Sequence, residues 1–309
     1  MTQRRLGRTD LSFEPLVFGG NVFGWTLEEA EAFKVLDAFL DEGFTAIDTA
    51  NVYGKGKSET IVGNWMKARG NRDKVLVFTK LGSEMAPGEV GLSAKYMVKA
   101  VEESLKRLGT DRIDLYQSHR PDASTPQAET LEAYERLIKA GKVRAIGASN
   151  FSAAQHAEAD KIASSEHIAR YESEQPEYNL YARDRFEGAL QDFCVANEVG
   201  VIPYFSLAAG FLTGKYRSEA DFGKSPRGAR MGRYLDAKGQ RILAAMDRVS
   251  AQTGASLAEI ALAWLNAQPG ITAPIASATS LEQLKTLAKG VRLTLSPEQL
   301  HALTDAGKA

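Results

Sequence analysis

The sequence predicts a (β/α)8 TIM barrel, formed as a single domain over residues 1–309, with an N-terminal β-hairpin and a long loop after the seventh strand. Three observations predict it. Eight short apolar stretches each precede a stretch with helical spacing, which is the order of repeated βα units. The apolar stretches are nearly continuous, as in parallel strands that are covered on both faces. Their number, eight, favours a closed barrel over an open sheet.

The elements follow one another without a linker. The hairpin is expected over residues 3–6 and 11–14, around a turn that contains Gly7 and Asp10. Strands are expected at residues 16–19, 44–48, 75–80, 113–119, 143–149, 171–175, 200–205 and 271–277. Helices are expected at residues 26–41, 58–68, 93–108, 125–140, 153–165, 186–198, 240–253, 257–266 and 281–289.

Three local signals predict helix ends. Thr26 and Glu29 have the spacing of a capping box, in which each side chain binds the backbone of the other. Gly141 is expected to end the fourth helix. Ser296 followed by Pro297 predicts the start of a last helix, because proline fits the first helical position.

Composition excludes several classes of protein. The chain is 44% hydrophobic and 25% charged, so it can bury a large core. Its 38 basic and 39 acidic residues create no overall field for nucleic acid or a membrane. Cys194 is the one cysteine, which excludes an internal disulfide and favours a reducing compartment. The first ten residues lack an apolar signal core, so we expect a cytoplasmic protein without a membrane partner.

Proton-handling side chains stand where three consecutive strands end. The second strand ends at Asp48 and carries Tyr53 in its loop, the third ends at Lys80, and the fourth ends at His119. Each residue alone has an ordinary explanation, such as a turn cap or a solvated strand end. Barrel enzymes, however, carry their chemistry at the C-terminal ends of the strands. The four residues together therefore predict one catalytic site. Four histidines and one cysteine are too scattered to predict a metal site.

The chemistry that suits these four side chains is reduction of a carbonyl group. A free tyrosine has a pKa of about 10, which is too high for an efficient general acid near neutrality. An ammonium at Lys80 would lower the pKa of Tyr53, and Asp48 would keep Lys80 charged. Neutral His119 could donate a hydrogen bond to the substrate oxygen. No side chain is a hydride source, so a cofactor must supply the hydride.

Several motifs of this chain together resemble the aldo-keto reductase superfamily. They are the segment from Asp48 to Gly54 followed by Ser58 and Glu59, then LKRLGTDRIDLYQSH at 105–119, GKVRAIGASNF at 141–151, and Gln175. The resemblance extends over most of the chain and implies a (β/α)8 barrel that binds a nicotinamide dinucleotide. The family's catalytic tetrad falls on Asp48, Tyr53, Lys80 and His119, with none missing.

The resemblance also implies a set of cofactor contacts. Ser149, Asn150 and Gln175 would bind the nicotinamide carboxamide, for which an amide that both donates and accepts is suited. Tyr204 would stack under the nicotinamide ring. The segment around Gly210 would wrap the pyrophosphate, and the eighth strand would hold the adenosine ribose. The implied residues are Gly20, Asp48, Ser149, Asn150, Gln175, Tyr204, Gly210, Leu212, Lys215, Ser277, Thr279 and Gln283.

The chain departs from the family pattern near the expected adenosine site. Thr279 and Gln283 stand where many NADP-specific members carry a lysine or arginine. NADP is nevertheless the expected cofactor, and NAD is the alternative. After Tyr204, Phe205 and Ser206 replace the usual Ser-Pro pair.

The loop after the seventh strand is rich in basic residues. It predicts a local positive field that could hold an anion, and a mobile solvated loop is the alternative reading. Lys215 is its expected ligand. The loop's basic residues are Lys215, Arg217, Lys224, Arg227, Arg230 and Arg233, against Glu219 and Asp221.

The substrate is expected to be a small, partly apolar aldehyde or ketone. Its pocket is expected to be lined by Val22, Phe23, Tyr53, His119 and Arg120. Phe23 could instead only seal the barrel mouth.

Three other functions remain open from the sequence. One is a binding subunit that senses the nicotinamide cofactor with little turnover, as in the channel-associated branch of the same family. Another is alcohol oxidation with NAD, in the reverse direction. The last is a phosphate-sugar barrel enzyme without nicotinamide.

Overall fold

The computed structural model, which describes residues 2–224 and 228–308, is a parallel eight-stranded barrel. The sheet order is β10-β3-β4-β5-β6-β7-β8-β9, and every neighbouring pair is parallel. A parallel bridge between Val201 and Ile271 joins the two ends of the sheet, and the Ile275 amide donates to the Pro203 carbonyl at 2.9 Å. The strands are β3 Val17–Gly19, β4 Ala46–Asp48, β5 Leu76–Leu81, β6 Ile113–Ser118, β7 Val143–Ser149, β8 Tyr171–Gln175, β9 Gly200–Val201 and β10 Ile275–Ala276. The predicted barrel is confirmed.

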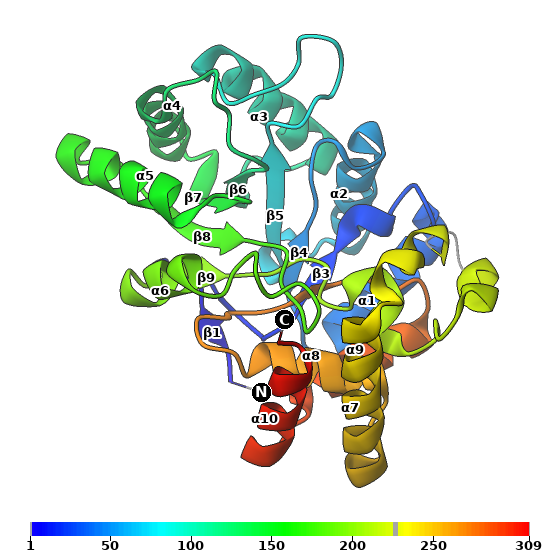
Figure 1. The fold of residues 1–309 in the computed structure, drawn as a ribbon. Helices are drawn as coiled ribbons and strands as arrows, with labels where there is room; N and C mark the ends of the chain where they lie inside the picture. Colours follow the sequence, from blue (N-terminus) through cyan, green and yellow to red (C-terminus); the bar gives the residue numbers. More distant parts are fainter. Residues whose placement is uncertain (1, 225–227, 309) are drawn as a thin grey trace.

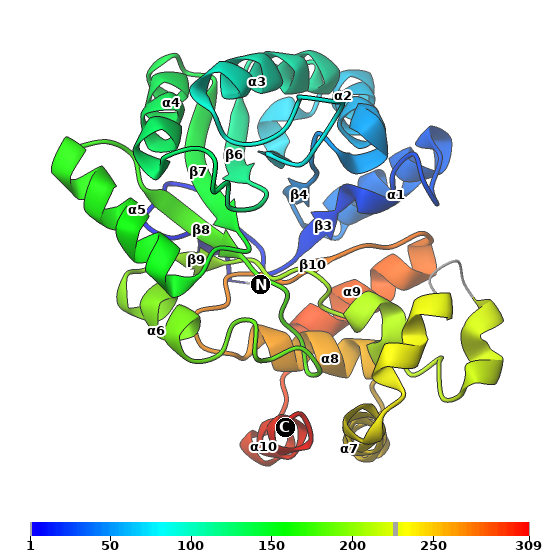
Figure 2. The same cartoon turned by 45° about the horizontal axis from the view of Figure 1, so that its top comes forward.

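Helices surround the strands. Figure 1 and Figure 2 show α1 to α6, α8 and α9 arranged around the sheet, while α7 and α10 lie outside α8. The bounds are α1 Glu29–Asp41, α2 Lys57–Arg69, α3 Ala94–Leu108, α4 Gln127–Lys139, α5 Ala153–Glu166, α6 Ala189–Ala196, α7 Ala237–Thr253, α8 Leu257–Asn266, α9 Leu281–Arg292 and α10 Pro297–Ala306. Within the described residues, no helix is both long and apolar enough to cross a membrane.

The predicted hairpin closes the floor of the barrel. β1 Arg4–Arg5 pairs antiparallel with β2 Ser12–Phe13. Leu6, Leu11 and Phe13 are buried, and the Phe13 ring meets the Phe78 ring edge-on with centroids 5.4 Å apart. These three side chains belong to one buried apolar cluster with residues in the strands or directly beside them, namely Val17, Ala46, Phe78, Leu115, Ala145, Ile202, Ala273 and Ile275.

The strand period positions the functional site above this floor. Side chains two residues apart on a strand point to the same face. The inward residue after Ala46 is therefore Asp48, the one after Phe78 is Lys80, and the one after Leu115 is Gln117. The apolar layer ends where a polar layer begins, at the C-terminal mouth of the barrel.

The boundaries differ from the predictions at several places. The capping box at Thr26 is wrong, because α1 begins at Glu29 after Glu28 and no side chain caps it. Thr26 instead follows a tight turn in which its amide donates to the Val22 carbonyl at 3.0 Å. α6 begins only at Ala189, and β9 and β10 are shorter than expected. The predicted start of the last helix is confirmed, with Pro297 in the first turn and a complete capping box at Ser296.

The predicted long loop after the seventh strand is confirmed. Its described residues, up to 224 and from 228 on, form three short 3-10 segments, η4 Ala208–Thr213, η5 Glu219–Lys224 and η6 Gly228–Tyr234. Figure 2 shows η5 and η6 at the edge of the barrel, beside α7 and α9.

Candidate active site

A buried chain of three side chains crosses the barrel mouth. The Lys80 ammonium nitrogen lies 2.6 Å from the Asp48 Oδ2 atom and 3.4 Å from the Tyr53 hydroxyl. It also donates to the Thr49 carbonyl at 2.8 Å. Lys80 is 0% exposed and Asp48 is 2% exposed. An ion pair this deeply buried is expected only where its geometry and hydrogen bonds are nearly complete.

The loop after β4 brings Tyr53 to this chain. Thr49 shares a 2.7 Å hydrogen bond with the Ser58 hydroxyl, which also donates to the Gly20 carbonyl at 2.7 Å. Tyr53 begins η2 (Tyr53–Gly56). The backbone is kinked within η2, where Gly54, Lys55 and Gly56 all have positive φ. The φ of 90° at Gly56 favours glycine, and a Cβ atom there would come within 2.6 Å of the Arg107 side chain and displace it.

A second ion pair, between Glu59 and Arg107, lies next to the same loop. The Glu59 carboxylate is 0% exposed. It accepts hydrogen bonds from the Thr79 hydroxyl at 2.6 Å and from Arg107 Nε at 2.6 Å. It therefore ties α2 to β5 and α3. Glu59 belongs to the motif that begins at Asp48, and Arg107 belongs to the motif at residues 105–119. This ion pair therefore gives a physical reason for the presence of both residues.

The groups bonded to Lys80 favour its charged, ammonium form. Burial lowers the pKa of Lys80, but Asp48 and Tyr53 raise it by more, so the net shift is upward. The Lys80 ammonium lowers the pKa of Tyr53, as expected, but the net shift of that pKa is upward. Burial raises the pKa of Tyr53 by more than the Lys80 ammonium lowers it, so the phenol stays protonated at neutral pH.

His119 faces Tyr53 across the mouth. The two rings are edge to face, with centroids 5.8 Å apart. Burial, Lys80 and Arg120 together lower the pKa of His119 to about 3, so the imidazole is neutral near pH 7. Its buried Nδ1 atom has no hydrogen-bond partner in the described part of the chain. A neutral imidazole beside a phenol suits the binding of one carbonyl oxygen by two donors.

Gln117 is part of the site and was not predicted. Its Nε2 atom lies 3.3 Å from Asp48 Oδ1, and its Oε1 atom accepts from Gln175 at 3.1 Å. Gln175 donates to the same Asp48 oxygen at 3.1 Å. Two amides therefore hold the carboxylate oxygen that Lys80 does not bind. The signal that could have found Gln117 is register, since it pairs directly with Lys80.

The loop after β7 brings further polar groups to the mouth. Ser149 donates to the Gln175 carbonyl at 2.8 Å, and Asn150 donates to the His119 carbonyl at 3.2 Å. The Tyr204 hydroxyl donates to Asn150 Oδ1 at 2.9 Å. Asn150 has a positive φ of 64°. It does not cap the following helix, because Ser152 does so through a complete capping box.

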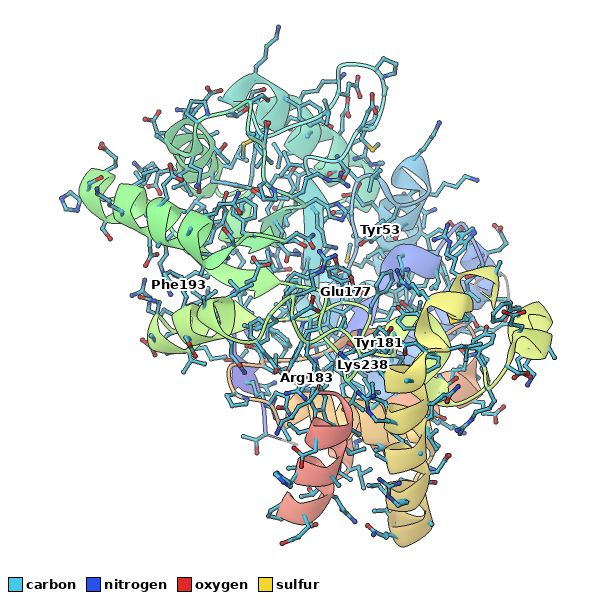
Figure 3. All side chains as sticks on the ribbon, viewed as in Figure 1. Tyr53, Glu177, Tyr181, Arg183, Phe193 and Lys238 are labelled. Atoms are coloured by element: carbon cyan, nitrogen blue, oxygen red, sulfur yellow. The ribbon has the colours of Figure 1, made fainter. Side chains whose placement is uncertain are left out.

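A cavity of about 1180 Å³ joins these groups. Its wall contains most of the predicted site residues, and Lys80 lies beneath it. Tyr53 lies near the middle of the molecule, whereas Phe193, on α6, lies at its periphery (Figure 3). The predicted residues in the wall are Val22, Asp48, Tyr53, His119, Arg120, Ser149, Asn150, Gln175, Tyr204, Gly210, Lys215, Ser277, Thr279 and Gln283.

Besides Lys80, three predicted residues lie outside the wall. Phe23 is 0% exposed and stacks on Phe18 in the core, with ring centroids 5.3 Å apart, so it does not face the cavity. Leu212, within η4, is likewise buried in the core. Gly20 lies behind the wall, where its carbonyl accepts from Ser58.

The basic loop reaches the cavity with two of its cations. Lys215 and Lys224 line the wall. Arg217 instead forms an ion pair with Asp247 at 2.8 Å, outside the wall. Arg230 and Arg233 are also outside it, and the predicted Arg227 lies outside the described residues. Lys224 was within the predicted basic loop but was not singled out.

A barrel with a buried carboxylate, amine and phenol at its mouth defines a class of enzyme that can move a proton to or from a bound oxygen. The model of the aldo/keto reductase family matches residues 15–308. The chain belongs to the aldo/keto reductase family, whose members generally use nicotinamide cofactors, and it is an oxidoreductase.

Relatives with different names match nearly the whole chain. The chain is 35% identical to an uncharacterized oxidoreductase, YrpG, of Bacillus subtilis (strain 168), over 97% of this chain and 94% of the relative. It is 37% identical to the aldo-keto reductase YhdN of the same organism, over 91% and 84%. It is also 34% identical to a probable voltage-gated potassium channel subunit beta of Oryza sativa subsp. japonica, over 96% and 94%.

Proposed function

We propose that the protein reduces aldehydes or ketones to alcohols, with NADPH as hydride donor and Tyr53 as proton donor. The observation that carries the proposal is the ammonium of Lys80, held 2.6 Å from a carboxylate and 3.4 Å from the Tyr53 phenol at the wall of a large cavity. Such a chain is suited to proton transfer at the phenol oxygen.

Each side chain has one task in this reaction. Tyr53 gives its proton to the carbonyl oxygen. The phenolate that remains is stabilised by the Lys80 ammonium, which Asp48 keeps charged and oriented. His119 donates a hydrogen bond to the same oxygen. When bound, the cofactor supplies the hydride that the carbonyl carbon accepts.

The residues present fit a nicotinamide dinucleotide. The cavity, of about 1180 Å³, exceeds the roughly 300–1,000 Å³ of ordinary ligand pockets, which leaves room for a dinucleotide and a small carbonyl compound. Asn150 and Gln175 offer amides near Tyr53. Lys215 and Lys224 offer cations for the phosphates of a dinucleotide.

The test begins with binding. NADPH and NADH are titrated separately while protein fluorescence is followed. Protein loaded with NADPH is then mixed with a panel of aldehydes and ketones, and the nicotinamide absorbance is recorded over one turnover. We expect tighter binding of NADPH and rapid loss of absorbance with some carbonyls. Absence of binding by both cofactors would refute the proposal and favour a barrel enzyme without nicotinamide.

A second candidate is a cofactor-sensing subunit with little turnover. The relatives named as probable potassium channel subunits beta, from Oryza sativa subsp. japonica and Arabidopsis thaliana, favour it. The complete tetrad favours the reductase. Tight NADPH binding without measurable turnover of any carbonyl would support the sensor. Faster oxidation of alcohols with NAD than reduction of carbonyls would favour the reverse direction.

A further inference from the structure

The proposed reaction assigns no role to Arg120, a cation at the barrel mouth. Arg120 directly follows His119, is exposed, and lines the cavity. Within residues 2–224 and 228–308, no hydrogen bond or ion pair joins its guanidinium to another group. Its charge nevertheless acts on the site, because it contributes, after burial and Lys80, to the lowered pKa of His119.

Several arginines with structural roles in this chain look different. They are buried or partly buried and bind fixed partners, as Arg107 binds Glu59 and Arg4 donates to the Ile271 carbonyl. Others that bind carboxylates include Arg72 with Asp114, Arg144 with Asp114 and Asp10, Arg170 with Glu172, and Arg183 with Glu187. Arg120 is therefore not explained as a structural ion pair.

The cavity wall offers Arg120 nothing to neutralise it. Asp48 is the one acidic residue among the described residues of the wall, and Lys80 already binds it at 2.6 Å. Lys215 and Lys224, the other cations of the wall, belong to the loop after β9. Arg120 thus stands at the end of β6, beside the groups that would bind the reacting oxygen.

We infer that the substrate is a carbonyl compound that carries a carboxylate a few bonds from the reacting carbon, and that Arg120 binds this carboxylate. The inference rests on the proposed reductase function. Consecutive Cα atoms are about 3.8 Å apart, so His119 and Arg120 can hold two ends of one short molecule. The planar guanidinium matches a carboxylate through two parallel hydrogen bonds. A bound substrate also displaces water, which strengthens the attraction.

The experiment compares acids with their neutral esters. Wild-type protein with NADPH is assayed on succinic semialdehyde and glutaric semialdehyde, and on the methyl ester of each. We expect kcat/KM to be about tenfold to a hundredfold higher for the acids, as for one hydrogen-bonded charge pair. Added salt should reduce this preference, since the mouth is open to solvent.

Three variants separate the guanidinium from charge in general. Arg120→Gln should bring the ratio of acid to ester close to one, chiefly by raising KM for the acid. Arg120→Lys should retain part of the preference, because the charge stays and the fork is lost. Arg185→Gln removes an exposed cation outside the cavity wall, and should retain the full preference.

Each contrary result has a separate meaning. Equal turnover of acids and esters by the wild type, or an unchanged ratio in Arg120→Gln, would overturn the inference and leave the reductase intact. Weaker NADPH binding by Arg120→Gln with an unchanged ratio would overturn it by assigning Arg120 to a cofactor phosphate. Failure of the wild type to oxidise NADPH with any carbonyl would refute the proposed function itself.

Discussion

At the residue scale, burial decides the electrostatics of the site. The sequence predicts a Tyr53 pKa lowered by Lys80, but burial raises the pKa of Tyr53 by more than the ammonium lowers it. Residue types and strand ends predict which groups meet. They do not predict how strongly water is excluded from the site, because the burial of these groups depends on loops from elsewhere in the chain that pack over them. The same burial keeps His119 neutral, as the sequence predicts.

These pKa values predict a broad, flat pH profile for carbonyl reduction. The pKa of His119 is about 3, so the imidazole stays neutral at every higher pH. The pKa of Tyr53 is raised above its ordinary value of about 10, so the phenol loses its proton only at still higher pH. We expect kcat/KM to be constant from about pH 5 to about pH 9. An inflection near pH 6.5 in the wild type that disappears in His119→Gln would contradict this.

The ion pair of Lys80 and Asp48 predicts a strong coupling in stability. Lys80→Met leaves a buried carboxylate without its cation and should reduce the free energy of unfolding by about 3–5 kcal/mol. Asp48→Asn should also destabilise, because it leaves the ammonium without its anion. The double variant should recover much of the loss, as measured by urea unfolding of all four proteins. Additive losses would show that the two residues do not stabilise one another.

At the element scale, a buried pair holds the loop after β7. Glu174, on β8, is 0% exposed, and its Oε1 atom accepts from the Phe151 amide at 3.3 Å. Its Oε2 atom lies 2.8 Å from the Nε2 atom of His156, on α5. The carboxylate therefore joins β8, α5 and the loop in which Asn150 adopts a positive φ.

Loss of this carboxylate should loosen the loop. Glu174→Leu leaves the Phe151 amide and the His156 ring without partners, and should cost about 1–3 kcal/mol for each buried polar group. We expect faster amide hydrogen exchange at residues 149–153 than in the wild type. Glu166→Gln, an exposed change at the end of α5, is the control and should exchange like the wild type. Equal protection of the loop in Glu174→Leu would exclude the anchoring role.

The elements also mark the limits of sequence prediction. β5, with its run of apolar residues, is predicted well because that pattern is local. The failed capping box at Thr26 and the late start of α6 depend on how turns pack against the barrel. Gln117 was missed for the same reason, since a polar residue inside a strand has meaning only through its register with Lys80.

At the scale of the whole molecule, stability and chemistry lie at opposite ends of the barrel. The floor is apolar and closed by the hairpin, whereas the mouth is polar and open. This division is usual for (β/α)8 barrels. It accounts for how much of the site could be predicted, because the barrel order alone assigns Asp48, Lys80 and His119 to one end.

The division predicts that damage to the floor affects stability more than binding. Phe13→Ala removes a fully buried ring and should reduce the free energy of unfolding by about 3–5 kcal/mol. NADPH affinity should stay within about twofold of the wild type at temperatures where the variant is folded. Val98→Ala, at an exposed apolar position of α3, is the control. A large loss of affinity in Phe13→Ala would contradict the separation of floor and mouth.

The central claim is that Tyr53 supplies the proton, and one measurement tests it most directly. Wild-type protein and Tyr53→Phe are each loaded with NADPH and mixed with an aldehyde that the wild type reduces, and one turnover is followed by nicotinamide absorbance. We predict unchanged NADPH affinity and a rate lowered by about a hundredfold or more, as for loss of a general acid. Reduction by Tyr53→Phe at the wild-type rate would contradict the account.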